Sequence, residues 1–251
     1  MAIKESTHWY SQDGSPAYTV IGANGKERNT TLRDARKMNL APSVTTVMGV
    51  AAKPALENWK IDQALMAALT LPREEDESLD DFMRRAKSDS KEQAIQAAQR
   101  GTEIHAMVES GFSDGQDNVA FRAVFDALNA LFPVEPWIAE ESFCTGGFGG
   151  KIDLYSPNGI VVDFKTKDGL CGKDPRKLVY DEHGMQLSAY ALGLGFKNPV
   201  RVSVFIDRAD PELVLTHHWD SESHEKHSGM FLALLEYWQL VKGYSAKEIP
   251  A

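Results

Sequence analysis

The feature that most constrains the fold is a pair of short apolar segments joined by a strong turn. The segments are Gly149–Asp153 and Val161–Lys165, and Ser-Pro-Asn-Gly occupies positions 156–159 between them. These four residue types form turns readily, and β-prone runs on both sides of such a turn are typical of a β-hairpin. The sequence therefore predicts two antiparallel strands here, and with them a sheet.

The length of the turn decides which side chains of the hairpin face each other. If residues 157–159 form a three-residue loop, Asp153 lies opposite Asp163, with Cβ atoms about 5 Å apart. Lys165 then shares that face, because side chains alternate along a strand. A two-residue Asn-Gly turn would instead place the two aspartates on opposite faces. Only the three-residue loop predicts a site.

Two facing carboxylates repel each other unless a positive group joins them. Oxygen ligands of this kind suit a hard cation such as Mg²⁺. The pair Asp153 and Asp163, with Lys165 beside them, is therefore a candidate catalytic metal site. The alternative is a solvated Asp-x-Lys pair on a strand surface, which is a common arrangement.

Length and composition favour one domain built on one core. The chain has 251 residues, 43% of them hydrophobic, which is enough for a sizeable core. We expect a single domain over residues 1–251, with an N-terminal elaboration at 1–40 and the motif-bearing core at 100–195. The net charge of −9 argues against a protein that coats nucleic acid, although an enzyme with a local basic groove remains compatible with it.

Targeting signals and cysteine clusters are not expected. No apolar run approaches a membrane span, and residues 1–9 lack a signal-peptide core, so we expect a cytoplasmic protein with no membrane partner. Cys144 and Cys171 are the two cysteines. They cannot form a four-cysteine zinc or iron–sulfur site within one chain, and we expect free thiols.

The order of the predicted elements indicates the fold class. Strands are expected at 17–21 in an N-terminal hairpin, and at 138–144, 148–155, 160–167, 199–206 and 213–219. Helices are expected at 32–38, 43–49, 54–70, 88–110, 118–131, 182–194 and 223–241. This order predicts an α/β protein with a mixed central β-sheet flanked by α-helices and a small N-terminal β-hairpin.

Two further residues are candidate metal ligands. His105 lies four residues after Gly101 on one helical face, and a neutral imidazole binds metals well; a buried core histidine is the alternative. Glu141, on the strand before the hairpin, is expected to face the side of the sheet that carries Asp153. A solvated edge glutamate explains it equally well.

Two other segments are candidates for contacts with substrate. Gln186 and Tyr190 share a helical face at i and i+4, where they could position a water, a phosphate or a base; a buried face with one polar tip is the alternative. The connection 165–177 is locally basic in an acidic protein, which suits contact with phosphate. A solvated loop is the alternative. Its further cations are Lys167, Lys173, Arg176 and Lys177.

Taken in order, these motifs resemble those of the PD-(D/E)XK nucleases, and most closely the RecB-type exonuclease branch. That branch includes phage proteins and the mitochondrial genome maintenance exonuclease. Its pattern is a Gly-x-x-x-His helix, a Gly-Gly-x-x-Asp strand, an Asp-x-Lys strand and a Gln-x-x-x-Tyr helix. All four pieces occur here in order: Gly101 with His105, Gly149-Gly150 with Asp153, Asp163 with Lys165, and Gln186 with Tyr190. The proline of the family name is absent, because Val162 precedes Asp163.

The resemblance implies a restriction-endonuclease-like core and metal-dependent hydrolysis of DNA, usually leaving a 5′-phosphate and a 3′-hydroxyl. It implies that Mg²⁺ or Mn²⁺ is bound by His105, Asp153, Asp163 and the Phe164 carbonyl. Lys165 would orient the attacking water and stabilise the transition state, and Gln186 and Tyr190 would position the motif or the strand. No iron–sulfur cluster is implied, because the cysteines that hold it in some members are absent.

The resulting expectation is a metal-dependent DNA exonuclease acting on single-stranded or end-bearing DNA. It would serve recombination, replication or repair, with partner proteins of those processes, in the host cytoplasm if the gene is carried by a phage. The expected DNA contacts are Lys167, Lys173, Arg176, Lys177, Arg100, Ser43 and Thr45. The alternatives are a structure-specific or sequence-specific endonuclease of the same fold, a non-catalytic DNA-binding or protein-binding module, and an unrelated α/β protein.

Overall fold

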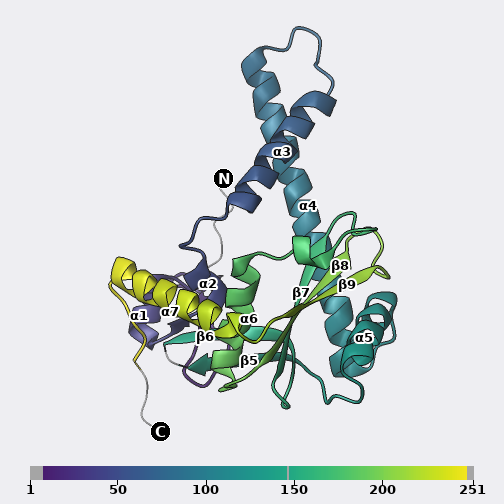
Figure 1. The fold of residues 1–251 in the computed structure, drawn as a ribbon. Helices are drawn as coiled ribbons and strands as arrows, with labels where there is room; N and C mark the ends of the chain where they lie inside the picture. The colour runs from purple at the N-terminus through teal and green to yellow at the C-terminus, as the bar shows by residue number, and fades with distance from the viewer. Residues whose placement is uncertain (1–7, 146, 248–251) are drawn as a thin grey trace. The chain divides into compact units, whose positions relative to one another are not determined.

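The computed structural model describes residues 8–145 and 147–247 (Figure 1). The chain forms two compact units, described separately below. The sheet unit consists of Met1–Ala51 and Met107–Ala251, and the helical unit of Ala52–Ala106. The first seven residues of the predicted N-terminal elaboration lie outside the described residues.

A five-stranded sheet forms the centre of the sheet unit. Its strands follow one another in the order β5, β6, β7, β8 and β9, with bounds Ile138–Thr145, Phe148–Ser156, Ile160–Lys167, Val200–Asp207 and Val214–Trp219. All neighbours are antiparallel except β7 and β8, which are parallel. Helix α6 (Asp181–Gly193) forms the crossover that a parallel pair requires (Figure 1). The predicted fold class, a mixed sheet with flanking helices, is confirmed.

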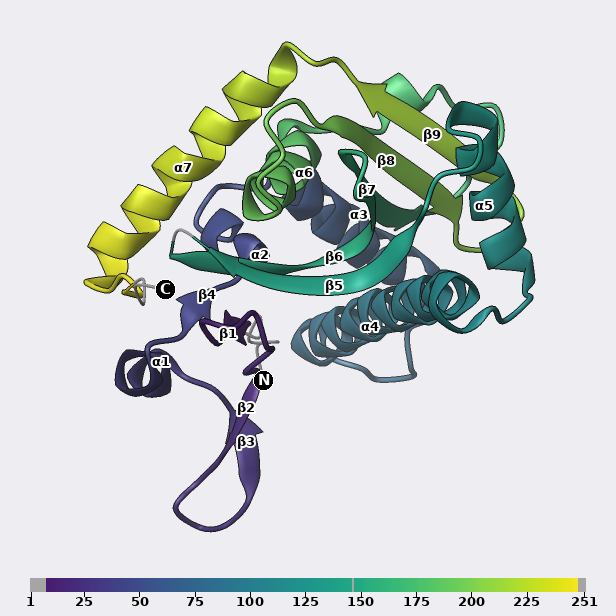
Figure 2. The same ribbon diagram turned by 90° about the horizontal axis from the view of Figure 1, so that it is seen from below.

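Helices cover the two faces of the central strands, so that β8 is buried almost throughout. On one face, Arg201 of β8 hydrogen-bonds to Ser188 of α6. On the other face, the ring of His218 in β9 contacts Phe132, which follows α5 (Val119–Leu131). Figure 2 shows α6 and α5 against different sides of the sheet. Asp163 pairs with Ser203 and shares the α6 face with Arg201.

The N-terminal part of the sheet unit contains the predicted hairpin, formed by β2 (Thr19–Ile21) and β3 (Glu27–Asn29). Helix α1 (Leu32–Met38) follows it, beginning at a capping box between Thr31 and Asp34. Strand β1 (Trp9–Tyr10) pairs instead with β4 (Ala41–Pro42). Helix α2 (Val44–Met48) begins after Ser43, whose hydroxyl caps it by accepting the Thr46 N–H at 3.0 Å. The predicted N-terminal hairpin and both short helices are confirmed.

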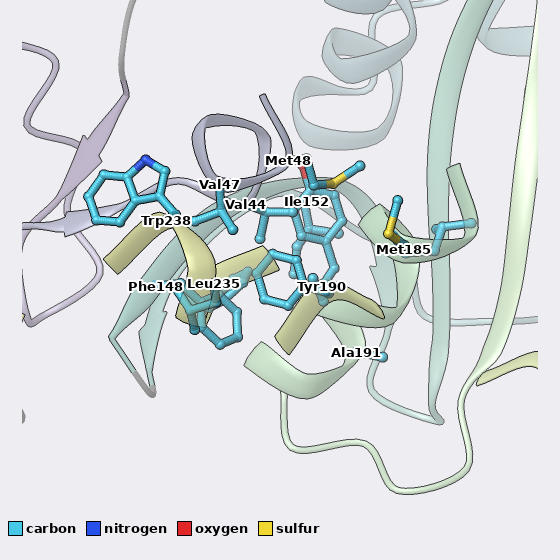
Figure 3. Packing of buried hydrophobic residues seen from close by; sticks show 14 of the residues in the cluster. Val44, Val47, Met48, Phe148, Ile152, Met185, Tyr190, Ala191, Leu235 and Trp238 are labelled. Carbon is cyan, nitrogen blue, oxygen red and sulfur yellow. The ribbon is translucent and has the colours of Figure 1, made fainter. Parts of the chain in front are cut away.

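The main hydrophobic core lies between α2, β6, α6 and α7 (Ser223–Lys242) (Figure 3). Residues from segments far apart in the sequence meet there, which fixes α6 against the sheet. They include Val44, Val47, Phe148, Ile152, Met185, Tyr190, Leu235 and Trp238. Because α6 carries Gln186 and Tyr190, the core positions two of the predicted site residues.

The helical unit contains α3 (Pro54–Thr70) and most of α4 (Leu79–Asp114). Helix α4 is longer than predicted, since it begins at Leu79 instead of near residue 88 and ends at Asp114 instead of 110. The Ser78 hydroxyl accepts the Asp81 N–H at 3.1 Å and so caps the first turn. The acidic residues Asp80 and Asp81 lie in this first turn, where negative charge stabilises the N-terminus of a helix. Among the described residues, no helix has the length and apolar character needed to cross a bilayer.

Candidate active site

The register of the β6–β7 hairpin is the one that the three-residue loop predicts. Ser156 pairs with Ile160, and Leu154 with Val162. Gly159 adopts a φ of 94° in the turn, a conformation that glycine reaches without strain. Counting one step beyond the last pair places Asp153 across from Asp163.

The turn is held by a carboxylate from outside the hairpin. Oε2 of Glu135 accepts hydrogen bonds from Ser156 Oγ at 2.7 Å and from Asn158 Nδ2 at 2.9 Å. These bonds lower the pKa of Glu135, because they stabilise its ionised form. The register on which the site depends is therefore anchored at the turn.

At Asp153, next to the last backbone pair of Leu154 and Val162, a side-chain hydrogen bond joins the two strands. Asp153 Oδ2 accepts the backbone N–H of Phe164 at 2.8 Å. The Asp153 carboxylate thus reaches the backbone immediately after Asp163. This hydrogen bond fixes the Asp153 side chain next to the strand segment that carries Asp163.

Asp163 is the most buried carboxylate of the site, with 1% of the residue exposed. Its Oδ2 lies 2.6 Å from Lys165 Nζ, and the lysine side chain is 25% exposed. A buried carboxylate needs a nearby cation to offset the loss of hydration. Lys165 supplies positive charge on the side of Asp163 that leads toward solvent.

Helix α6 contributes the next two groups. Lys165 Nζ donates a hydrogen bond to Gln186 Oε1 at 3.1 Å, and Gln186 Nε2 donates to the Tyr190 hydroxyl at 2.9 Å. Burial and the negative charges of Asp153 and Asp163 hold the pKa of Tyr190 well above its usual value. The four side chains Asp163, Lys165, Gln186 and Tyr190 therefore form one connected polar chain.

The double glycine allows close approach of rings to β6. A Cβ at Gly150 would lie 2.9 Å from ring atoms of both Phe143 and Tyr190. A Cβ at Gly149 would lie 2.7 Å from the Phe143 carbonyl oxygen and 2.8 Å from Tyr10. Any larger residue would push Tyr190 or the backbone away from the site.

His105 and Arg100, two of the predicted site residues, belong to the helical unit. His105 is half-buried in α4, and Arg100 Nη1 lies 3.1 Å from Glu103 Oε2. Their assignments as metal ligand and DNA contact stay predictions.

Glu141 is exposed, and its partner in the β5–β6 ladder is Ile152. By counting, Glu140 is the residue across from Asp153. Glu140 has a φ of 60° and forms an ion pair with Lys151. A role for Glu141 at the metal stays a prediction.

The cations of the basic segment differ in their surroundings. Lys167 is half-buried, and its Nζ lies 5.3 Å from the centre of the Tyr180 ring. Lys173 Nζ donates to a backbone carbonyl at 3.1 Å. Arg176 pairs with Asp174 at 2.8 Å, whereas Lys177 is exposed. Lys167 is therefore the one of these four that packs on an aromatic ring beside the site.

Ser43 and Thr45 lie at the start of α2, and a bridge between Ser43 and Gly149 brings this turn next to the double glycine. Ser43 is buried and its hydroxyl caps the helix. Thr45 is exposed. Thr45 thus has the accessibility that a DNA contact needs, while the Ser43 hydroxyl has a structural role.

A cation at this site would have few protein ligands. Within residues 8–145 and 147–247, no group of three or more His, Cys, Asp and Glu side chains is arranged to hold a metal. Mg²⁺ commonly binds through one or two carboxylates and retains several waters or substrate phosphates. The carboxylates of Asp153 and Asp163, joined through the backbone of Phe164, are compatible with that kind of binding, and the ligand set stays a prediction.

Sequence reasoning missed one buried residue beside this chain of side chains. His183 lies on α6 three residues before Gln186 and is 5% exposed. The i, i+3 spacing that places both on one helical face was available in the sequence. Its packing on Tyr180 and Phe205 was not.

Comparisons with known proteins add little. No protein-family model and no curated protein matches the chain. An alkaline exonuclease from Laribacter hongkongensis is 13% identical, covering 75% of this chain and 95% of its own, with a TM-score of 0.38. The protein SSO0001 is 18% identical, covering 71% and 85%, with a TM-score of 0.29. At these values neither likeness bears on the activity of this chain.

Proposed function

We propose that this protein is a metal-dependent DNA nuclease, acting as an exonuclease on single-stranded or end-bearing DNA. The observation that supports this best is the connected chain Asp163–Lys165–Gln186–Tyr190, with Asp153 hydrogen-bonded to the backbone beside Asp163. A carboxylate pair next to a lysine provides what phosphodiester hydrolysis needs. These are anionic oxygen ligands for a cation and an ammonium group close to them.

Each residue of the site has a part in the proposed reaction. Bound Mg²⁺ or Mn²⁺ would lower the pKa of water and neutralise charge on the scissile phosphate. Asp153, Asp163 and the Phe164 carbonyl would hold the cation. Lys165 would orient the attacking water and stabilise the charge that develops on the phosphate oxygens.

The Lys165 ammonium must point in one direction to act in this way. Gln186 holds it through the 3.1 Å hydrogen bond, and Gln186 is in turn fixed by Tyr190. The raised pKa of Tyr190 keeps its hydroxyl protonated at neutral pH. The α6 side chains are therefore positioning groups in this proposal.

The finer assignments follow the motif resemblance. The chain would belong to the RecB-type branch of the PD-(D/E)XK nucleases and act in DNA recombination, replication or repair with partner proteins of those processes. Its place of action would be the cytoplasm, that of the host if the gene is carried by a phage. His105 would complete the metal ligands, and the segment 165–177 would contact the strand.

A degradation assay tests the proposed function. End-labelled linear and circular DNA, single-stranded and duplex, is incubated with Mg²⁺, Mn²⁺ or EDTA. We expect metal-dependent degradation of linear DNA, reduced by at least about 10²-fold in Asp163→Asn and Lys165→Met, because each loses charge needed in the transition state. Circular DNA should survive if free ends are required. Cleavage of circles would assign an endonuclease instead.

Matched controls separate the site from general changes in charge. Asp114→Asn and Lys37→Met remove the same charges from exposed positions at the end of α4 and on α1, and we expect full activity from both. If the folded, metal-supplied wild type cleaves no DNA, the catalytic proposal is wrong. Retention of labelled DNA in that case would favour the binding module.

A further inference from the structure

His183 is a buried polar residue that the proposed reaction does not use. It is 5% exposed, and its Nδ1 has no hydrogen-bond partner among the described residues. Its Nε2 lies 4.0 Å from Glu182 Oε1, beyond hydrogen-bond range. A buried polar atom without a partner costs free energy. A ligand that reached this nitrogen, which is closed off from solvent in this structure, would supply the missing hydrogen bond.

Two lysines lie near the His183 ring. The Tyr180 ring lies next to His183 and to one of these lysines, Lys167. The centre of the Tyr180 ring is 5.5 Å from the centre of the His183 ring and 5.3 Å from Lys167 Nζ. Lys165 is tied to Gln186, one helical turn after His183. Lys165 and Lys167 are i and i+2 on β7, so they share its α6-facing side.

The charges of this region are mainly positive. Burial and the ammonium groups of Lys165 and Lys167 lower the pKa of His183 to about 3. Burial lowers the pKa of Lys167 as well, and Glu182 only partly opposes this. Two further cations act on Lys167: Arg208 is paired with Asp168 at 2.6 Å, and Lys173 donates to the Asp168 backbone carbonyl at 3.1 Å. An anion entering here would meet one half-buried ammonium group and one imidazole nitrogen.

We propose that Lys167 and His183 form a subsite for a second phosphate of the DNA strand, next to the phosphate that Lys165 would contact. Lys167 supplies the charge, and His183 Nδ1–H donates a hydrogen bond to a non-bridging oxygen. Adjacent residues on the same face of a strand are about 6.6 Å apart, so each of the two lysines can present its ammonium group to a different phosphate of the DNA strand. The choice of DNA as the ligand rests on the proposed function, whereas the affinity of these two side chains for a phosphate group does not depend on it.

The first test is independent of catalysis. Inorganic phosphate is added to the full-length protein, and the imidazole signals are followed by NMR, with His183 assigned by its loss in His183→Phe. We expect a saturable shift of the His183 signal that is absent in Lys167→Met. The signal of His218, which is exposed, should not shift. A His183 signal that phosphate leaves unmoved overturns the subsite.

The second test measures binding of a labelled single-stranded oligonucleotide in EDTA over a range of salt concentrations. We expect Lys167→Met to weaken binding at least about tenfold and to reduce the salt slope by about 0.7, the value for one phosphate contact on a single strand. Lys37→Met and His218→Phe serve as controls. An unchanged slope in Lys167→Met contradicts the proposal even if stability has changed.

The results separate the two proposals. DNA degradation without a phosphate-dependent His183 shift would leave the nuclease intact and overturn the subsite. A His183 shift and a reduced salt slope without any DNA degradation would support the subsite and contradict the catalytic function.

Discussion

Asp153 accepts the backbone N–H of Phe164 at 2.8 Å, across the two strands that carry the motif carboxylates. This contact lies where the β6–β7 ladder of hydrogen-bonded pairs has ended. One carboxylate thus has two roles: it joins the strands, and it is a candidate metal ligand. Substitutions of Asp153 can separate these roles.

Asp153→Asn should retain the strand contact, because the amide oxygen can still accept the Phe164 N–H, but lose the charge. Asp153→Ala loses both. We expect both variants to lose DNA degradation, and only Asp153→Ala to unfold more easily, by about 1 kcal/mol or more. Urea unfolding with the degradation assay measures this. Equal stability of the two variants would show that the contact contributes nothing.

Gly149→Ala should destabilise the protein by about 2 kcal/mol. Its Cβ would lie 2.7 Å from the Phe143 carbonyl oxygen, a backbone atom that cannot turn aside. The matched control is Gly229→Ala in α7, where a Cβ meets nothing within 4 Å. There the same substitution should stabilise by up to about 1 kcal/mol, through helix propensity. Thermal or urea unfolding should thus give shifts of opposite sign.

His183 predicts a pH dependence of stability. Its pKa is about 3 in the folded protein, mainly through burial, against 6.5 for a free side chain. Between these values the unfolded chain binds one more proton at this residue. The free energy of unfolding therefore falls as pH falls from 6.5 toward 3, by up to about 1.4 kcal/mol per pH unit from this residue.

Replacing His183 removes that dependence. Urea unfolding of His183→Phe at several pH values should give a shallower fall below pH 6.5 than the wild type. His227 and His224 should still make the free energy of unfolding fall somewhat at low pH, because burial lowers their pKa values too. His218→Phe, at an exposed position, should follow the wild type. Parallel curves for His183→Phe and wild type would mean that His183 is not buried in its neutral form.

Arg201 joins β8 to α6 and α7 from inside the core. It is fully buried, and its guanidinium donates to Ser188 Oγ at 2.9 Å, Ser223 Oγ at 2.8 Å and the Asp220 carbonyl at 2.7 Å. Arg201→Met would remove one hydrogen-bond donor from each of these three acceptors inside the core, so we expect unfolding to become easier by roughly 3 kcal/mol.

Urea unfolding measures this change, with Arg176→Met as the control. Arg176 is an exposed arginine that forms an ion pair with Asp174, and the control should shift stability by at most about 0.5 kcal/mol. If the two variants are equally stable, the buried network of Arg201 contributes no net stability, as replacement of buried charges by apolar side chains sometimes shows.

Local patterns in the sequence were enough for the hairpin and most element boundaries. The turn residues at 156–159 predicted the hairpin but left its register open between a two-residue and a three-residue loop, and the structure has the three-residue loop that places Asp153 across from Asp163. Helix starts were equally readable, since α2 and α5 begin within one residue of the predicted positions, at the caps Ser43 and Asn118. Helix α4 was the main error, because its cap at Ser78 lies about ten residues before the expected start of the helix, next to an acidic run. These features depend on neighbours within a few residues.

The sequence by itself determined the strands and the order of the polar motifs, because turn, cap and alternation preferences act over short distances; the register of the hairpin came from the structure. Only the tertiary structure decided which of those groups meet. It linked Lys165 to Gln186 across the crossover, placed His183 and Lys167 on one tyrosine ring, and buried Arg201 between β8, α6 and α7. Such contacts depend on how a helix packs on a sheet, and that packing cannot be predicted from the residues next to each group in the sequence.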